Sequence, residues 1–188
     1  MIAGTALPSI ISMPAGASEV CITDDPFSPA LSSNTIVSSV QGSFELAKTR
    51  NLNPITSIEA HEWGSMIDPF SKAKQNRYTR VIAADCIWML SQHRNLVQSI
   101  AHFLCKESPK ACALVVAGFH TGRDTVVDFF QQFLTSKERD NIAEELSIAE
   151  IYECDMNGER RPWQESRANE SREDAKRWCV VAVIVRAA

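Results

Sequence analysis

Acidic and aromatic residues follow several apolar runs in this sequence, at the points where strands would end. Asp24 follows the run Glu19–Thr23, and a carboxylate there suits hydrogen bonds to two ribose hydroxyls. Trp63 follows the run Pro54–His61, and an indole there can stack on an adenine ring. Ligands of open α/β sheets bind beyond the carboxyl ends of the strands. The pattern therefore predicts a nucleoside-binding site.

Two later strand ends carry further groups of the same kind. Asp85 and Trp88 come shortly after the continuous apolar run of Tyr78–Ala84. His120 comes directly after Ala111–Phe119, and the sequence identifies no partner for its imidazole. All four strand ends thus place polar or aromatic side chains where a nucleoside cofactor would lie.

Several polar and aromatic residues of the sequence also have an ordinary structural interpretation. Asp24, with the Asp-Pro pair that follows it, suits a turn, and Trp63 could be a core aromatic residue. Asp85 could cap a helix, and His93 is expected to be structural rather than catalytic. The pair Arg160-Arg161 is expected on a solvated face of a charged loop.

Strands that alternate with helices must position these side chains. The closing part of the chain differs, because two predicted strands, Ile148–Cys154 and Lys176–Arg186, follow one another with only the charged stretch Asn157–Ala175 between them. This order predicts an α/β fold with a mostly parallel sheet that ends in an antiparallel hairpin. The predicted helices span Phe27–Lys48, Ser91–Glu107 (capped by Ser91) and Gly122–Lys137.

Composition sets the broad class of the protein. The chain has 188 residues, of which 45% are hydrophobic and 22% charged, with a net charge of −4. These values predict a single globular domain over residues 1–188, and they favour neither nucleic-acid nor membrane binding. The six cysteines lack zinc-site spacing, so we expect free thiols in a reducing cytoplasm and no metal.

Four segments together resemble one family. The segment Ala3–Ile10 looks like the second half of the glycine-rich loop of S-adenosylmethionine-dependent methyltransferases, and Glu19–Pro26 resembles their second strand with its acidic end. The segments His61–Gly64 and Ala83–Trp88 resemble later motifs of the seven-β-strand (class I) protein-lysine methyltransferase branch. That branch includes fungal proteins described as nicotinamide N-methyltransferase-like or as elongation-factor methyltransferases. The resemblance implies a Rossmann-like sheet.

The resemblance also implies roles around the cofactor, S-adenosyl-L-methionine. Gly4 and Thr5 would lie beside its methionine part, and Asp24 would hold its ribose. Trp63 would pack on its adenine, and Ala84 would line the site near the sulfonium. No metal is needed for this chemistry.

On the acceptor side, the resemblance implies that Asp85 lines the reacting centre and that Trp88 shapes the entrance. The expected acceptor is a protein lysine or N-terminal amine, with a translation elongation factor as a candidate partner, or a small amine such as nicotinamide. A cytoplasmic monomer is expected. The alternative is a catalytically impaired remnant that acts as an interaction module.

One departure from the family pattern concerns the first strand. The chain begins inside the glycine-rich motif, so we expect that strand to be missing or a stub and the domain to be N-terminally truncated. The strands Glu19–Thr23 and Tyr78–Ala84 would then lack a shared neighbour. Unpaired buried backbone groups cost about 1–3 kcal/mol each, so a missing strand would lower the stability of the fold and weaken cofactor binding.

Overall fold

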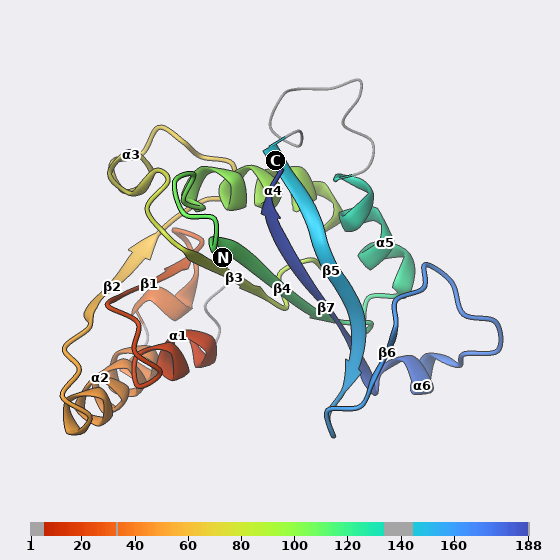
Figure 1. Cartoon of the computed structure of the whole chain (residues 1–188), viewed down its shortest axis with the longest axis horizontal. Helices are drawn as coiled ribbons and strands as arrows, with labels where there is room; N and C mark the ends of the chain where they lie inside the picture. Colours follow the sequence, from red (N-terminus) through yellow and green to blue (C-terminus); the bar gives the residue numbers. More distant parts are fainter. Residues whose placement is uncertain (1–5, 33, 134–144, 188) are drawn as a thin grey trace. The chain divides into compact units, whose positions relative to one another are not determined.

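The structure is a computed structural model that describes residues 6–32, 34–133 and 145–187 (Figure 1). The chain divides into two compact units, Met1–Glu62 and Trp63–Ala188, and each is described by itself. The assignment of one domain to the whole chain stays a prediction.

The first unit is built on two parallel strands. In β1 (Glu19–Asp24) and β2 (Ile55–Ala60), the register runs from Glu19 opposite Ile55 to Asp24 opposite Ala60. Alternate residues of β1 are buried, as expected for a strand with one face on a core. The helical elements of this unit are α1 (Leu7–Ser12), η1 (Pro29–Ser32) and α2 (Asn34–Thr49).

Helix α2 ends in a turn that returns the chain toward β2. Asn51 has a positive φ of 59°, and the N–H of Leu52 donates to the carbonyl of Ala47 at 3.1 Å. A left-handed residue with this six-to-one hydrogen bond is a Schellman motif, which asparagine tolerates better than most residues. Leu52 then packs with the buried core of the unit, which consists of Ala6, Met13, Val20, Ile22, Ile36 and Ala47.

The second unit contains a five-stranded sheet with the order β3-β4-β7-β5-β6. The pair β3–β4 is parallel, whereas β7 runs antiparallel to both β4 and β5. The strands β3, β4 and β5 therefore run in one direction, and the predicted antiparallel hairpin at the end of the chain is confirmed. The strands are β3 (Arg80–Ala84), β4 (Cys112–Gly118), β5 (Leu146–Asp155), β6 (Arg160–Pro162) and β7 (Trp178–Arg186).

Two helices cover one face of this sheet (Figure 1). They are α4 (His93–Phe103), preceded by η2 (Leu90–Gln92), and α5 (Arg123–Gln131). Alternate strand residues are buried on that face, as in the run Ala113, Val115 and Ala117 of β4, because successive side chains point to opposite faces. The remaining helices of the unit are α3 (Pro69–Lys74) and α6 (Arg172–Ala175).

Several details differ from the sequence predictions. The helix expected from Ser91 is split, and α4 begins at His93 with Gln92 at its N-cap and no side-chain cap. The helix expected over Gly122–Lys137 is α5, and its last predicted residues lie outside the described ranges. The charged stretch between the last two strands, expected as a loop, contains β6, which pairs with β5, and the short helix α6, which Ser171 caps.

The pairing of β1 and β3 is relevant to the expected absence of the first strand of the family pattern. Within the described ranges, β1 pairs only with β2, and β3 pairs only with β4 among the named strands. The expectation of a missing first strand stays a prediction. In the part of the chain that is described, no helix combines the length and apolar character of a membrane span.

Candidate functional site

Asp85 and His120 come together at the carboxyl ends of β3 and β4. Oδ1 of Asp85 lies 3.6 Å from Nε2 of His120, and both side chains are exposed to solvent. The separation suits an ion pair with a protonated ring but is longer than an ordinary hydrogen bond. An exposed imidazole beside a carboxylate can accept a proton from a bound ligand.

The backbone explains why the two side chains meet. Asp85 has a φ of 54°, and its N–H donates to the carbonyl of Val116 at 2.7 Å, which turns the chain at the end of β3. At the end of β4, Gly118 leaves room for the imidazole, since a Cβ on Gly118 would lie 3.3 Å from Nδ1 of His120. The parallel pairing of β3 with β4 thus supplies the partner that the sequence could not identify for His120.

Residues around Asp85 anchor this turn and leave one aromatic ring at the surface. Cys86 and Ile87 are buried, whereas Trp88 is 44% exposed. Ala84, the last residue of β3, is half-buried opposite Val116. An exposed indole near Asp85 is consistent with a position at an entrance, and the assigned roles of Asp85, Trp88 and Ala84 stay predictions.

Trp63 and Gly64 pack into the second unit. Trp63 is only 9% exposed, which leaves little of the indole for stacking on a ligand. Gly64 has a φ of 81°, and a Cβ there would lie 2.9 Å from the side chain of Asn95. Its N–H donates to Oγ of Ser99 at 2.9 Å. Gly64 therefore holds the chain against α4, and the adenine contact of Trp63 stays a prediction.

Asp24 ends β1 in the first unit. Its Oδ1 accepts the N–H of Asp25 at 2.8 Å, and the residue is only 2% exposed. The strand-end position is as predicted, and the local bond shows that the turn interpretation also holds. Gly4 and Thr5 lie outside the described residues. That Asp24, Trp63 and Asp85 line one cavity stays a prediction.

His93 has the structural role expected from the sequence. It is buried, with Nδ1 2.7 Å from Oδ2 of Asp128 and Nε2 2.9 Å from the carbonyl of Ile87. Its ring also makes an edge contact with Phe129. Both nitrogens are thus occupied by oxygen atoms that join α4 to α5 and to the chain after β3, and no ligand is needed to explain the residue.

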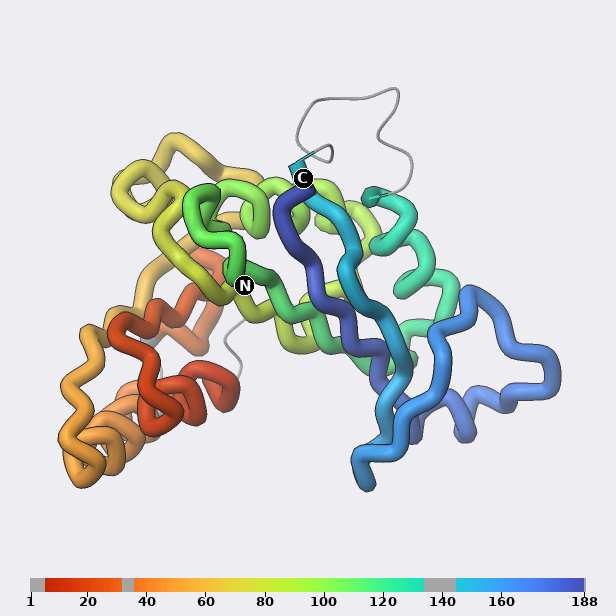
Figure 2. The backbone as a smooth tube through the Cα atoms, in the orientation of Figure 1, coloured from red at the N-terminus to blue at the C-terminus, as the bar shows by residue number. Residues whose placement is uncertain are grey.

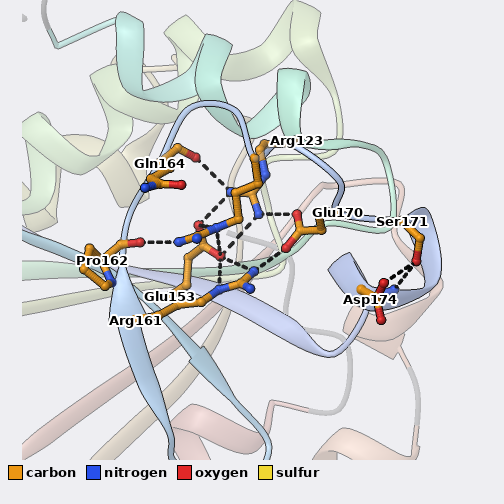
Figure 3. A network of polar contacts seen from close by, with 9 residues as sticks. Arg123, Glu153, Arg161, Pro162, Gln164, Glu170, Ser171 and Asp174 are labelled. Carbon is orange, nitrogen blue, oxygen red and sulfur yellow. Dashed lines mark hydrogen bonds and ion pairs between the residues drawn. The ribbon is translucent and has the colours of Figure 1, made fainter.

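The segment between β5 and β7, residues 156–177, is here called the β5–β7 connection (Figure 2). It is held by a network around Glu153 of β5, which is fully buried (Figure 3). Nη1 of Arg123 lies 2.7 Å from Oε1 of Glu153, Nε of Arg161 lies 2.8 Å from Oε2, and Nε of Arg167 lies 3.2 Å from Oε1. The expectation that Arg161 is solvated is therefore wrong, because its guanidinium binds a buried carboxylate.

Glu170 completes this network from within the connection. Its carboxylate accepts from Arg161 and from Nη2 of Arg123, the latter at 2.6 Å. Burial opposes ionisation of Glu153 and Glu170, but the hydrogen bonds and charges of the two arginines outweigh it, so the pKa of each carboxyl lies below its ordinary value. Arg123 begins α5 shortly after His120, so the network fixes the connection near the end of β4.

A cavity of about 390 Å³ lies at the other end of the five-stranded sheet. Asn76, before β3, and Glu145, before β5, both line it, which places it at the amino ends of the strands. Since α/β ligand sites lie at the carboxyl ends, we favour the Asp85–His120 end as the functional site. Within the described ranges, no cluster of His, Cys, Asp and Glu has the arrangement of a metal site.

Comparison with solved structures finds the same architecture elsewhere. The crystal structure of a SAM-dependent methyltransferase from Methanosarcina mazei matches 97% of this chain and 88% of its own, with a TM-score of 0.50 and 10% sequence identity. The chain has the fold of a SAM-dependent methyltransferase. This methyltransferase fold confirms the α/β class expected from the sequence.

Curated proteins supply a relative by sequence. The protein N-terminal and lysine N-methyltransferase EFM7 of Cryptococcus neoformans, from two strains of serotype D, is 25% identical over 111 residues. The match covers 58% of this chain, and the chain spans about a third (35%) of the length of these relatives. No family model matches the chain. This distant relative supports the resemblance of the sequence to methyltransferases.

Proposed function

We propose that this chain contributes to an S-adenosylmethionine-dependent N-methyltransferase that acts on a protein lysine or a protein N-terminal amine. The observation that carries the proposal is the exposed Asp85–His120 pair at the carboxyl ends of β3 and β4, within the fold of such enzymes. The relatives named as protein N-terminal and lysine methyltransferases favour this acceptor class over a small amine.

The chemistry of the acceptor amine determines the roles of His120 and Asp85. When bound, S-adenosylmethionine supplies a methyl group that its sulfonium already activates. A lysine or N-terminal ammonium must lose a proton before its nitrogen can attack. In this proposal, Nε2 of His120 takes that proton, and the carboxylate of Asp85, 3.6 Å away, stabilises the resulting imidazolium. The exposure of both groups allows a protein-borne amine to reach them.

Asp24 is the residue of the first unit whose chemistry fits the cofactor. It ends β1 at the carboxyl side, and a carboxylate can accept hydrogen bonds from both ribose hydroxyls. Because it is 2% exposed and bonded to the N–H of Asp25, a ribose can reach it only when that turn opens. We propose Asp24 as the ribose-binding residue on these grounds.

Calorimetric titration with S-adenosylhomocysteine tests the cofactor role. Hydrogen bonds to a charged group are worth about 1.5–3 kcal/mol, so Asp24→Asn is expected to weaken binding by roughly ten- to a hundredfold. The matched control is Asp25→Asn, the same change at the exposed neighbouring residue, which should alter binding less than about threefold. Equal effects of the two variants would remove Asp24 from the proposal.

Methylation of lysine-containing peptides and of protein N-termini tests the acceptor role. His120→Gln and Asp85→Asn should lower kcat at neutral pH by roughly a hundredfold, the usual scale for losing a proton acceptor. The His120→Gln deficit should shrink as pH rises toward the acceptor's own pKa, because solvent then removes the proton. The control Asp124→Asn, at an exposed position of α5, should retain full activity. A deficit that does not change with pH would show that His120 is not the proton acceptor.

A second candidate function is an interaction module without methyl transfer. The near-complete burial of Asp24 is the observation that favours it. Titration with S-adenosylhomocysteine distinguishes the methyltransferase from the interaction module. An interaction module would give no heat of binding over the concentration range in which a methyltransferase becomes saturated. An elongation factor as partner, a monomeric state and a cytoplasmic location stay proposals.

A further inference from the structure

Cys154 and Cys179 lie directly opposite each other on neighbouring antiparallel strands. Cys154 is close to the end of β5, Cys179 is close to the start of β7, and the two are partners in the strand register. Opposed residues on antiparallel strands have Cα atoms about 4.5–5.5 Å apart and side chains on the same face. A disulfide spans Cα separations of about 4.4–6.8 Å, so the backbone already has the required spacing.

The other cysteines of the described residues have different surroundings. Cys112 lies opposite Val185 and Cys21 lies opposite Ser57, so neither faces a second thiol across its strand pair. Cys86 and Cys105 lie outside the strands, and Cys86 is buried. Cys154 and Cys179 are both half-buried free thiols, which a small reagent can reach.

The Cys154 thiol is only weakly held. On its other side Cys179 lies opposite Gly118, where the imidazole of His120 takes the space that a side chain would fill. Sγ of Cys154 donates only a long hydrogen bond, 3.4 Å, to the carbonyl of Asp155. Little has to be broken before the Cys154 side chain turns toward its partner.

We propose that Cys154 and Cys179 form a reversible disulfide, with a small disulfide such as oxidised glutathione as the oxidant. The thiolate of one cysteine attacks a sulfur of the oxidant, which forms a mixed disulfide and releases one glutathione thiolate. The second cysteine then attacks the protein sulfur of that mixed disulfide and releases the second glutathione. The protein loses two protons and two electrons, and the oxidant becomes two glutathione thiols.

The neighbourhood of Cys179 affects its reactivity. Burial, the negative charge of Asp85 and the proximity of Cys154 raise the pKa of the Cys179 thiol. Because the thiolate is the attacking species, Cys179 reacts more slowly at neutral pH than a thiol of ordinary pKa.

The disulfide would join the two ends of the β5–β7 connection. Cys154 immediately follows Glu153, whose carboxylate holds Arg123, Arg161 and Arg167. A covalent bond at the base of the connection would keep its ends together even when that charge network is disrupted. The inference concerns a modification site and does not depend on methyl transfer.

The test is to incubate the full chain in glutathione buffers of graded oxidised fraction, alkylate the remaining thiols, and map peptides without reduction. In oxidised buffer, the number of alkylated cysteines should fall from six to four. A linked pair of peptides containing Cys154 and Cys179 should appear and should disappear with dithiothreitol. The oxidised chain should also show a higher Tm than the reduced chain, because the cross-link restricts the unfolded state.

Variants provide the controls. In Cys154→Ser and in Cys179→Ser, oxidised buffer should no longer remove two cysteines from the alkylated count. Cys112→Ser should still form the disulfide, and it should show one alkylated cysteine fewer than the wild type in each buffer. The wild-type peptide map does not depend on the folding of any variant. Alkylation of both Cys154 and Cys179 in the most oxidised buffer, or a linkage between other cysteines, would overturn the proposal.

Discussion

Replacing Glu153 by glutamine is expected to destabilise the second unit strongly. The substitution keeps the shape of the side chain but removes the negative charge that faces Arg123, Arg161 and Arg167. Glu153 is completely buried, so water cannot replace the lost carboxylate. Glu170 would be left as the carboxylate that compensates Arg123 and Arg161 in this network.

The magnitude follows from burial and from the number of partners. Removing one member of a buried ion pair typically costs about 3–5 kcal/mol, because the remaining charge is left uncompensated. Here the three guanidiniums keep some exposure, between 11% and 24% of each side chain, so water screens part of the loss. We therefore expect a loss of about 2–4 kcal/mol in the free energy of unfolding.

Urea unfolding at neutral pH, followed by tryptophan fluorescence, measures this change. The matched control is Glu150→Gln on the same strand, where the carboxylate is 58% exposed and 4.0 Å from Nη1 of Arg160. An exposed pair of this kind contributes little, so the control should stay within about 0.5 kcal/mol of the wild type. If the two variants unfold at the same urea concentration, Glu153 does not hold the network together.

The same variant predicts a pH dependence. The pKa of Glu153 in the folded chain lies below its ordinary value of 4.5, so the unfolded chain binds this proton more readily. Its contribution is therefore complete above the ordinary pKa and is lost as pH falls through the lower, folded pKa. The stability difference between wild type and Glu153→Gln should be largest near neutral pH and should shrink below about pH 4.5. A difference that grows on acidification would refute this assignment.

Three further variants test the packing that supports the site. Trp163→Ala removes the ring stacked on Phe119, the aromatic residue that follows β4, and should cost about 1–3 kcal/mol and increase tryptic cleavage of the β5–β7 connection. His93→Phe removes the contacts to Asp128 and to the buried carbonyl of Ile87 and should lower stability by about 1–3 kcal/mol in thermal melts, mainly through Ile87 because Asp128 is 42% exposed and can be hydrated; an unchanged Tm would refute the structural role of His93. Gly64→Ala should lower the free energy of unfolding by about 1–3 kcal/mol. Replacing Asn95 by glycine as well should recover part of this loss, because it relieves the 2.9 Å contact but not the positive φ of residue 64. An unchanged Tm in Gly64→Ala would refute the close approach.

The sequence by itself determined the fold class and the positions of the main strands. Continuous apolar runs such as the one ending at Ala84 are typical of buried strands, and β3 occupies that run. Two predicted strands with only a charged stretch between them indicate an antiparallel pair, and β5 and β7 form that pair. The order of acidic residues after apolar runs was also enough to place Asp24 and Asp85 at strand ends.

The sequence also placed some local features wrongly. Ser91 satisfies the composition of a helix cap, but the chain first makes a short 3₁₀ turn and α4 begins later, at His93. Arg161 lies in a strongly charged stretch, which usually means solvent. A buried acid on another strand decided its environment, and sequence spacing carries no information about such a partner.

Tertiary structure alone decided which distant residues meet. His120 gained Asp85 as a partner because β3 and β4 lie parallel and adjacent, and because Gly118 leaves space for the ring. Cys154 and Cys179 became neighbours because the register of β5 and β7 opposes them. Local propensity fixes which segments become strands, but pairing and register depend on the free energy of packing the whole sheet, which no single segment contains.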